Sequence, residues 1–173
     1  MSEQFSDEAF RDRVKQNYDF SEWAGRTKEG DRGVRISGFV LPSNTFEVVE
    51  KEDLTPTRRQ DRVTRYIVSP RGEKRRIIIN VFECKSVEEA HETLIDIVMT
   101  YMAPTLPRCE TTNLTVGDIC FGSHGDVNLT VIFARFNILC EIKSATPGPN
   151  SVDEFAKAVD ASILDQYRRA QPG

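Results

Sequence analysis

The sequence predicts an α+β fold: a single twisted antiparallel sheet of about six strands, with two main helices packed on one face. Two observations carry this prediction. Short runs rich in β-branched and aromatic residues are separated by turn residues, which is typical of strands joined in hairpins. Two longer segments repeat their apolar residues every three or four positions, which indicates helices that cover a core.

The chain of 173 residues fits one such domain, preceded by a short arm. Residues 1–32 are polar and interrupted by glycines, and we expect them to form an N-terminal arm. Within the arm, 7–18 predicts a short helix with a narrow apolar stripe, which we expect to pack on its own domain because an isolated helix this short is marginal in water. Residues 33–173 are expected to form the single α+β domain.

Four strands are expected in the first half of the chain, over 34–42, 45–54, 62–69 and 75–84. The first two read as one hairpin and the last two as another. The turn of the second hairpin has a clear mechanism, because Pro70 presets its own φ and Gly72 can take the positive φ that the turn needs.

The helical period appears over 86–102 and again over 151–169. Prolines follow the first of these segments and end it, because proline cannot continue a helix. Each segment opens with a capping box, a serine followed three positions later by a glutamate: Ser86 with Glu89, and Ser151 with Glu154.

The second half of the chain offers a strand over 116–122 and a single long strand over 127–145. Strands followed by a helix therefore occur twice. This order is compatible with a diverged ββα pseudo-repeat, and equally with coincidence, because capping boxes and hairpin–helix orders are common.

Composition and termini point to a cytoplasmic protein without a membrane segment. No apolar run approaches the roughly 18–20 residues that span a bilayer, and the first residues lack the basic and apolar regions of a secretion signal. The four cysteines lie far apart without a C-x-x-C pair, so we expect reduced thiols. The net charge of -4 is too small to name a partner.

Neither catalytic nor metal chemistry is predicted, and we expect no cofactor. The two histidines, His91 and His124, lack the spacing of a zinc site, and no P-loop or dinucleotide motif follows a strand. Cys120 and His124 lie four positions apart across a turn, without a third group to orient them as nucleophile and base. A pair of carboxylates that meets only in space stays open.

Cations concentrate on the hairpin over 58–76, which we interpret as a surface for a protein partner. Nucleic acid is disfavoured because the chain has a pI near 5.3 and the hairpin offers only Tyr66 for stacking on bases. A structural alternative is that the cations protect an exposed edge strand from unwanted pairing. The predicted partner-binding residues are Arg62, Arg65, Arg71, Lys74, Arg75 and Arg76.

The best functional prediction is therefore a non-enzymatic cytoplasmic protein-binding module, one version being an inhibitor or immunity-type protein that binds another protein. The alternative is a small-ligand-binding domain or cryptic enzyme with a pocket between sheet and helices. That pocket would use the partly polar face of the long strand, where an apolar lining carries a few polar groups. Its predicted lining is Phe121, Phe133, Arg135, Asn137 and Leu139.

Overall fold

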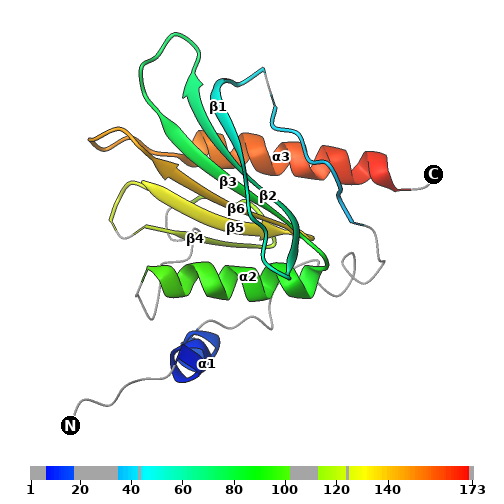
Figure 1. Cartoon of the computed structure of the whole chain (residues 1–173). Coiled ribbons are helices and arrows are strands. Elements are labelled where there is room, and N and C mark those ends of the chain that lie inside the picture. The colour runs from blue at the N-terminus through cyan, green and yellow to red at the C-terminus, as the bar shows by residue number, and fades with distance from the viewer. Residues whose placement is uncertain (1–6, 18–34, 43, 102–112, 124, 172–173) are drawn as a thin grey trace.

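A computed structural model describes residues 7–17, 35–42, 44–101, 113–123 and 125–171. It confirms the α+β class, with one six-stranded antiparallel sheet in the order β1-β2-β3-β6-β5-β4 (Figure 1). The strands are β1 (Phe46–Leu54), β2 (Gln60–Pro70), β3 (Ile77–Cys84), β4 (Ile119–Gly122), β5 (Thr130–Arg135) and β6 (Ile138–Ser144). The helices are α1 (Asp7–Asn17), α2 (Val87–Thr100) and α3 (Asp153–Ala170).

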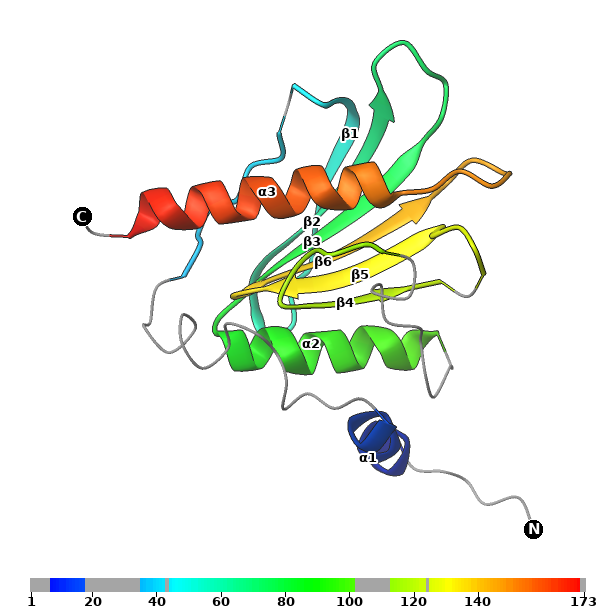
Figure 2. The same ribbon diagram turned by 180° about the vertical axis from the view of Figure 1, so that it is seen from behind.

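The two main helices cover opposite faces of the sheet, so the prediction that they share one face is wrong. On β5, Val131 and Phe133 belong to the core under α3, whereas Ile132 and Ala134 belong to the core under α2. Figures 1 and 2 show α3 crossing one side of the sheet, and α2 lying apart from α3. The physical reason lies in the strand itself, because its apolar residues face both ways and both faces must be shielded from water.

Six strands are present, but they are not the six that the sequence predicted. The segment over 35–42 contains no strand, although the sequence predicted a strand over 34–42 as the first half of a hairpin. The predicted long strand over 127–145 is two strands, β5 and β6, joined by the two-residue turn Phe136–Asn137. Phe136 takes a φ of 54°, and its ring stacks on that of Tyr167 in α3, with the centroids 3.8 Å apart.

The turn between β2 and β3 forms as predicted. The N–H of Glu73 donates to the carbonyl of Pro70 at 3.1 Å, and Gly72 has the positive φ of 79° that the turn requires. This hairpin projects beyond the body of the sheet at the top of Figure 1.

The two capping boxes have different outcomes. Ser86 caps α2, with its hydroxyl accepting from the N–H of Glu89 at 3.1 Å. The prediction of a second capping box, Ser151 with Glu154, is wrong, because α3 begins at Asp153 and its N-cap residue is Val152. The hydroxyl of Ser151 accepts from the N–H of Asp153 at 3.2 Å and lies just outside the helix.

Of the two alternatives left open by the sequence, a ββα pseudo-repeat does not describe the fold. Each half of the main domain is a three-stranded meander followed by a helix, β1–β3 with α2 and β4–β6 with α3. The antiparallel order of the sheet relates the two meanders only by rotation about an axis perpendicular to it. Such a rotation would leave both helices on one face, and they lie on opposite faces.

The predicted short helix is present as α1 and docks on α2. Val14 is fully buried, and Phe10 packs beside it against the core under α2. The guanidinium of Arg11 pairs with Glu92 and Asp96 on α2. The rest of the predicted arm lies outside the described residues.

The cysteines differ from the expectation of four reduced thiols. Cys84 and Cys140 are buried free thiols, and burial raises the pKa of Cys84 to about 12. Cys120, which is also buried, is disulfide-bonded. Cys109 lies outside the described residues.

In the part of the chain that the structure describes, no helix combines the length and apolar character needed to cross a membrane.

Candidate functional site

The first strand of the sheet, β1, forms an open edge. Among the described residues it pairs only with β2, so the main-chain groups along its outer side have no strand beside them. The seven residues over 47–53 are all exposed, in contrast to the central strands, which are buried on both faces. An edge of this kind is a template on which another chain can pair.

Two exposed valines lie on this edge. Val48 is 41% exposed and Val49 is 48% exposed, and both belong to the small set of large exposed hydrophobic residues in the described chain. The register shifts between Val48 and Glu50, so Val49 forms a β-bulge without a partner residue on β2. Bulges of this kind bend an edge strand and restrict which chains can pair with it.

The register assigns the charged residues of β1 to faces. Glu47, Glu50 and Glu52 lie opposite alternate residues of β2, and so they share the face of the sheet that α2 covers elsewhere. Lys51 and Asp53 share the other face with Phe46 and Val48. The strand carries a net charge of -3 from four acidic residues and one lysine.

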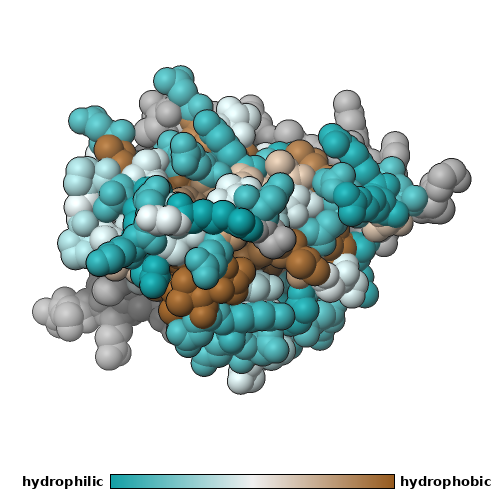
Figure 3. All heavy atoms as spheres, turned by 90° about the horizontal axis from the view of Figure 1, so that it is seen from above, coloured by the Kyte–Doolittle hydropathy of each residue, from teal (hydrophilic) through white to brown (hydrophobic). Residues whose placement is uncertain are grey.

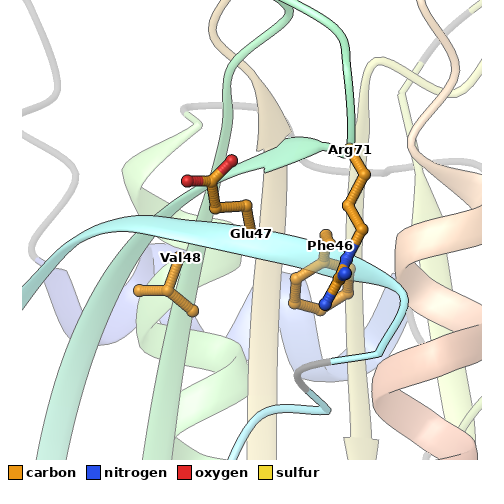
Figure 4. A pocket seen from close by; sticks show the side chains of 4 residues that line it. All are labelled: Phe46, Glu47, Val48 and Arg71. Carbon is orange, nitrogen blue, oxygen red and sulfur yellow. The ribbon is translucent and has the colours of Figure 1, made fainter.

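A pocket of about 430 Å3 opens at the beginning of β1. Phe46, Glu47, Val48 and Arg71 line it (Figure 4). Figure 4 shows Phe46 and Val48 pointing to one side of the strand, Glu47 pointing to the other, and Arg71 reaching from the β2–β3 turn to lie beside the Phe46 ring.

The floor of this pocket is fixed by the core. Phe46 is 1% exposed, and its ring packs against that of Phe155 in α3, with the centroids 5.5 Å apart. Arg75 lies over the Phe155 ring at 5.4 Å. The view from above in Figure 3 shows apolar patches set among hydrophilic side chains on this end of the molecule. The pocket therefore has a rigid aromatic floor and a charged rim.

Several cations of the predicted partner-binding hairpin are occupied within the fold. Arg62 pairs with Glu83 and donates to the carbonyl of Phe39 at 2.8 Å. Arg65 donates to the side-chain oxygen of Asn80 at 3.0 Å, although its side chain is exposed.

The other four cations lie at the far end of the hairpin. Arg75 pairs with Glu73 at 3.3 Å and is half-buried, as is Arg76. Arg71 and Lys74 are exposed at the turn, and of the six predicted residues only Arg71 lines the pocket. The six predicted partner-binding residues therefore lie at two different ends of the hairpin.

The five residues of the predicted pocket are not brought together. Phe121 and Leu139 face α2, whereas Phe133 faces α3 on the other side of the sheet. Asn137 is buried in the β5–β6 turn, where it accepts from the N–H of Ile36 at 2.9 Å. The prediction assumed one continuous strand, and the turn reverses the chain within it.

Arg135, the fifth of these residues, joins β5 to α3 through a buried ion cluster. Its guanidinium donates two hydrogen bonds of 2.8 Å to Asp160 on α3 and lies 3.2 Å from Asp118. Burial raises the pKa of Asp118 to about 6, and the N–H of Phe136 and the charge of Arg135 partly offset that rise. The hydrogen bonds of this cluster hold β5 and α3 together, so we regard the cluster as structural.

A second polar cluster lies beneath the end of α2. The Glu141 carboxylate accepts from Asn80 at 2.8 Å and from the hydroxyl of Tyr101 at 2.7 Å, and it pairs with Lys143 at 3.1 Å. Burial raises the pKa of Tyr101, and the hydrogen bond to Glu141 adds to that rise. Both carboxylate oxygens thus have partners within the chain.

Among the described residues no group of three or more histidine, cysteine, aspartate or glutamate side chains could hold a metal ion. Comparison of the chain with known protein families, with curated proteins and with solved structures found no match. The candidate site is therefore defined by its geometry: an open sheet edge with a pocket at one end. Sequence reasoning missed it because the order of the strands in the sheet, and so the identity of the edge strand, depends on pairing between residues far apart in the chain.

Proposed function

We propose that this protein is a non-enzymatic protein-binding module that takes up an extended segment of its partner as an added strand beside β1. The observation that carries the proposal is the exposure of seven consecutive residues on the outer strand of the sheet. In strand addition, main-chain hydrogen bonds supply affinity and side-chain pockets supply specificity, and β1 offers both.

The charge of β1 selects the segment. Two copies of a strand with a net charge of -3 would repel each other when paired, so self-association through this edge is disfavoured. A segment with lysine or arginine on one face and β-branched residues on the other would complement the three glutamates on one face of β1 and Val48 on the other. The preferred partner is therefore a basic, extended region of another protein.

An inhibitor or immunity-type role is one form of this function, because a partner's exposed strand or tail can be held by such an edge. The cytoplasmic location expected from the sequence stays a prediction. The disulfide at Cys120 is more typical of an oxidising compartment.

The second candidate function, a small-ligand-binding domain or cryptic enzyme, rests on the same pocket. Its volume of about 430 Å3 falls in the range of small-molecule sites. Its described lining supplies only one carboxylate and one guanidinium for chemistry. Substitution of Val49 decides between the two candidates, because Val49 is not among the lining residues and a small molecule seated in the pocket need not depend on it.

The test is selection from a display library of random twelve-residue segments tethered at both ends. We expect enrichment of segments that alternate basic and β-branched residues. Val48→Lys and Val49→Lys should each weaken binding of the selected peptides about tenfold, since they place a cation against a basic strand. Leu129→Lys is the matched control, because Leu129 is 40% exposed and lies outside β1.

Binding should also slow hydrogen exchange of the outward-facing amides of β1, since these would gain hydrogen bonds to the added strand. The proposal is overturned if no segment is enriched, or if the selected peptides bind both lysine variants as tightly as the wild type.

A further inference from the structure

The outer side of α2 is a helix-binding surface, and α1 occupies it. In Figures 1 and 2, α2 lies between α1 and the sheet. Val14 of α1 is fully buried, and Phe10 lies one turn before it. Both belong to the apolar cluster that includes Ile95 and Met99 of α2. These two α2 residues lie four positions apart, so the contact places one apolar stripe along another.

Charges flank this apolar contact. The guanidinium of Arg11 pairs with Glu92 and Asp96 on α2, and the Nζ of Lys15 lies 3.6 Å from Oε1 of Glu92. In the sequence, each of the two cations directly follows one of the two apolar residues of α1. The helix therefore presents two apolar–basic pairs, one turn apart, to α2.

The acidic side of this surface keeps its charge when α1 leaves. Arg59, in the connection between β1 and β2, also reaches α2, with Nη1 2.8 Å from Glu89 and Nε 3.3 Å from Asp96. One guanidinium cannot neutralise the three carboxylates of Glu89, Glu92 and Asp96. The empty surface would therefore carry a net negative charge, which favours a cationic helix.

The helix α1 is held weakly enough to be exchanged. It has 11 residues, and a helix this short is marginal in water unless it is packed against something. Of the α1 side chains that the structure describes, only Val14 is buried, and Arg11 keeps 18% of its side-chain surface exposed. Ion pairs that remain in contact with water contribute little, and elements with few buried contacts open most readily.

We infer that the outer side of α2 is a docking site for a basic amphipathic helix of another protein, and that α1 is a built-in competitor that leaves before the partner helix binds. The partner helix carries two apolar residues four positions apart, each followed by lysine or arginine. This inference goes beyond the proposed function, because it concerns α2 and not the edge strand.

The experiment measures binding of a labelled peptide with the sequence of residues 5–19, the α1 peptide, by fluorescence anisotropy. The proteins are the full-length wild type and two variants designed to release the tethered α1. Val14→Asp places a charge without a partner at a buried position. Arg11→Glu sets a carboxylate against Glu92 and Asp96.

We expect both released variants to bind the α1 peptide about tenfold more tightly than the wild type, in which the tethered helix competes at a high effective concentration. Hydrogen exchange over α1 should accelerate in both variants, which reports that the tethered helix has left. Asp12→Asn is the matched control, because Asp12 is exposed on the same helix, and it should bind the peptide as weakly as the wild type.

A further substitution locates the binding site on α2. Adding Glu92→Lys to Val14→Asp should weaken binding of the α1 peptide about tenfold, since it sets a cation against the arginine of the peptide. Circular dichroism of each variant verifies that the main domain is folded.

Four results would each overturn the inference. They are no binding of the peptide to either released variant, equal binding by the wild type and the released variants, binding that survives Glu92→Lys, and an α1 that stays protected from exchange in both variants. Val49→Lys in the Val14→Asp protein separates the two surfaces, because it should leave binding of the α1 peptide unchanged whether or not it weakens strand addition at β1.

Discussion

Replacing Asp118 by asparagine should remove a pH dependence that burial builds into the folded protein. The Asp118 side chain is 4% exposed and shares the Arg135 guanidinium with Asp160. Burial raises the pKa of Asp118 from 3.8 to about 6. Two carboxylates and one cation leave a net negative charge in this part of the core, and protonation of Asp118 relieves it.

The sign of the effect follows from comparison of the folded and unfolded chains. In the unfolded chain Asp118 loses its proton near pH 3.8, whereas the folded protein keeps that proton until about pH 6. The stabilising contribution is therefore fully present below pH 3.8 and is lost as the pH rises through 6. The difference between the two pKa values corresponds to about 3 kcal/mol in the free energy of unfolding.

Urea denaturation followed by circular dichroism, from pH 4 to pH 7.5, measures this contribution. We expect the free energy of unfolding of Asp118→Asn to rise relative to the wild type by about 2–3 kcal/mol across that range. Asp126→Asn is the control, since Asp126 is exposed and bears no buried charge, and its curve should run parallel to the wild type. Parallel curves for Asp118→Asn and the wild type would refute the reasoning.

Three further substitutions test the fold. Asn137→Ala should cost about 2–4 kcal/mol in the free energy of unfolding, because it leaves the buried N–H and carbonyl of Ile36 without partners, and hydrogen exchange should accelerate over 35–42. Gly117→Ala should destabilise the protein more than Gly38→Ala. Both glycines have φ near 70°, but an added Cβ would lie 2.6 Å from a backbone carbonyl at Gly117 and meet nothing within 4 Å at Gly38. Equal losses in urea denaturation would contradict that steric explanation.

Local signals predicted those elements whose stabilising contacts are close in sequence. The helix α2 was predicted because its apolar stripe and the Ser86 cap both lie within its own turns. The turn at Gly72 was predicted because proline and glycine fix its backbone directly. In both cases the residues that determine the structure lie within a few positions of it.

The β5–β6 turn could not be predicted in this way, because long-range contacts hold it. An aromatic residue at positive φ is unfavourable locally, and no glycine marks the position. The Phe136 ring stacks on Tyr167 of α3, and its N–H donates to Asp118 at 2.9 Å. These partners are distant in sequence, so the same residues read locally as the middle of one strand.

The prediction of a strand over 34–42 was wrong for a related reason. The side chains of Ile36, Phe39 and Leu41 are buried in the core as those of a strand would be, but the chain bends at Gly38, which has a φ of 71°. Side chains replace the ladder: its N–H groups donate to Asn137, Glu83 and Gln166 instead of to a neighbouring strand. Periodicity reports burial and extension, and it cannot report which groups accept the hydrogen bonds.

The candidate site was predictable only in part. The hairpin with Arg71 was singled out from its charge, and Arg71 does line the pocket. The importance of β1 was missed, because the sequence cannot say which strand lies at the edge of the sheet. That position depends on the pairing of β3 with β6, residues about 60 positions apart.

The architecture itself explains why β1 is left open. Neighbouring strands lie about 4.8 Å apart, so a six-stranded sheet is about 24 Å wide between its outer strands, whereas a helix with its side chains is about 10 Å across. One helix on each face cannot cover that width. The helix α2 packs on β3, β5 and β6 rather than on β1, so the uncovered width on its face falls on the β1 side, whereas on the other face α3 reaches β1 through the contact of Phe155 with Phe46. An edge strand left open in this way would invite self-pairing if it were apolar. The acidic charge of β1 disfavours that pairing, and under the proposed function the same charge would favour a basic segment over a neutral one.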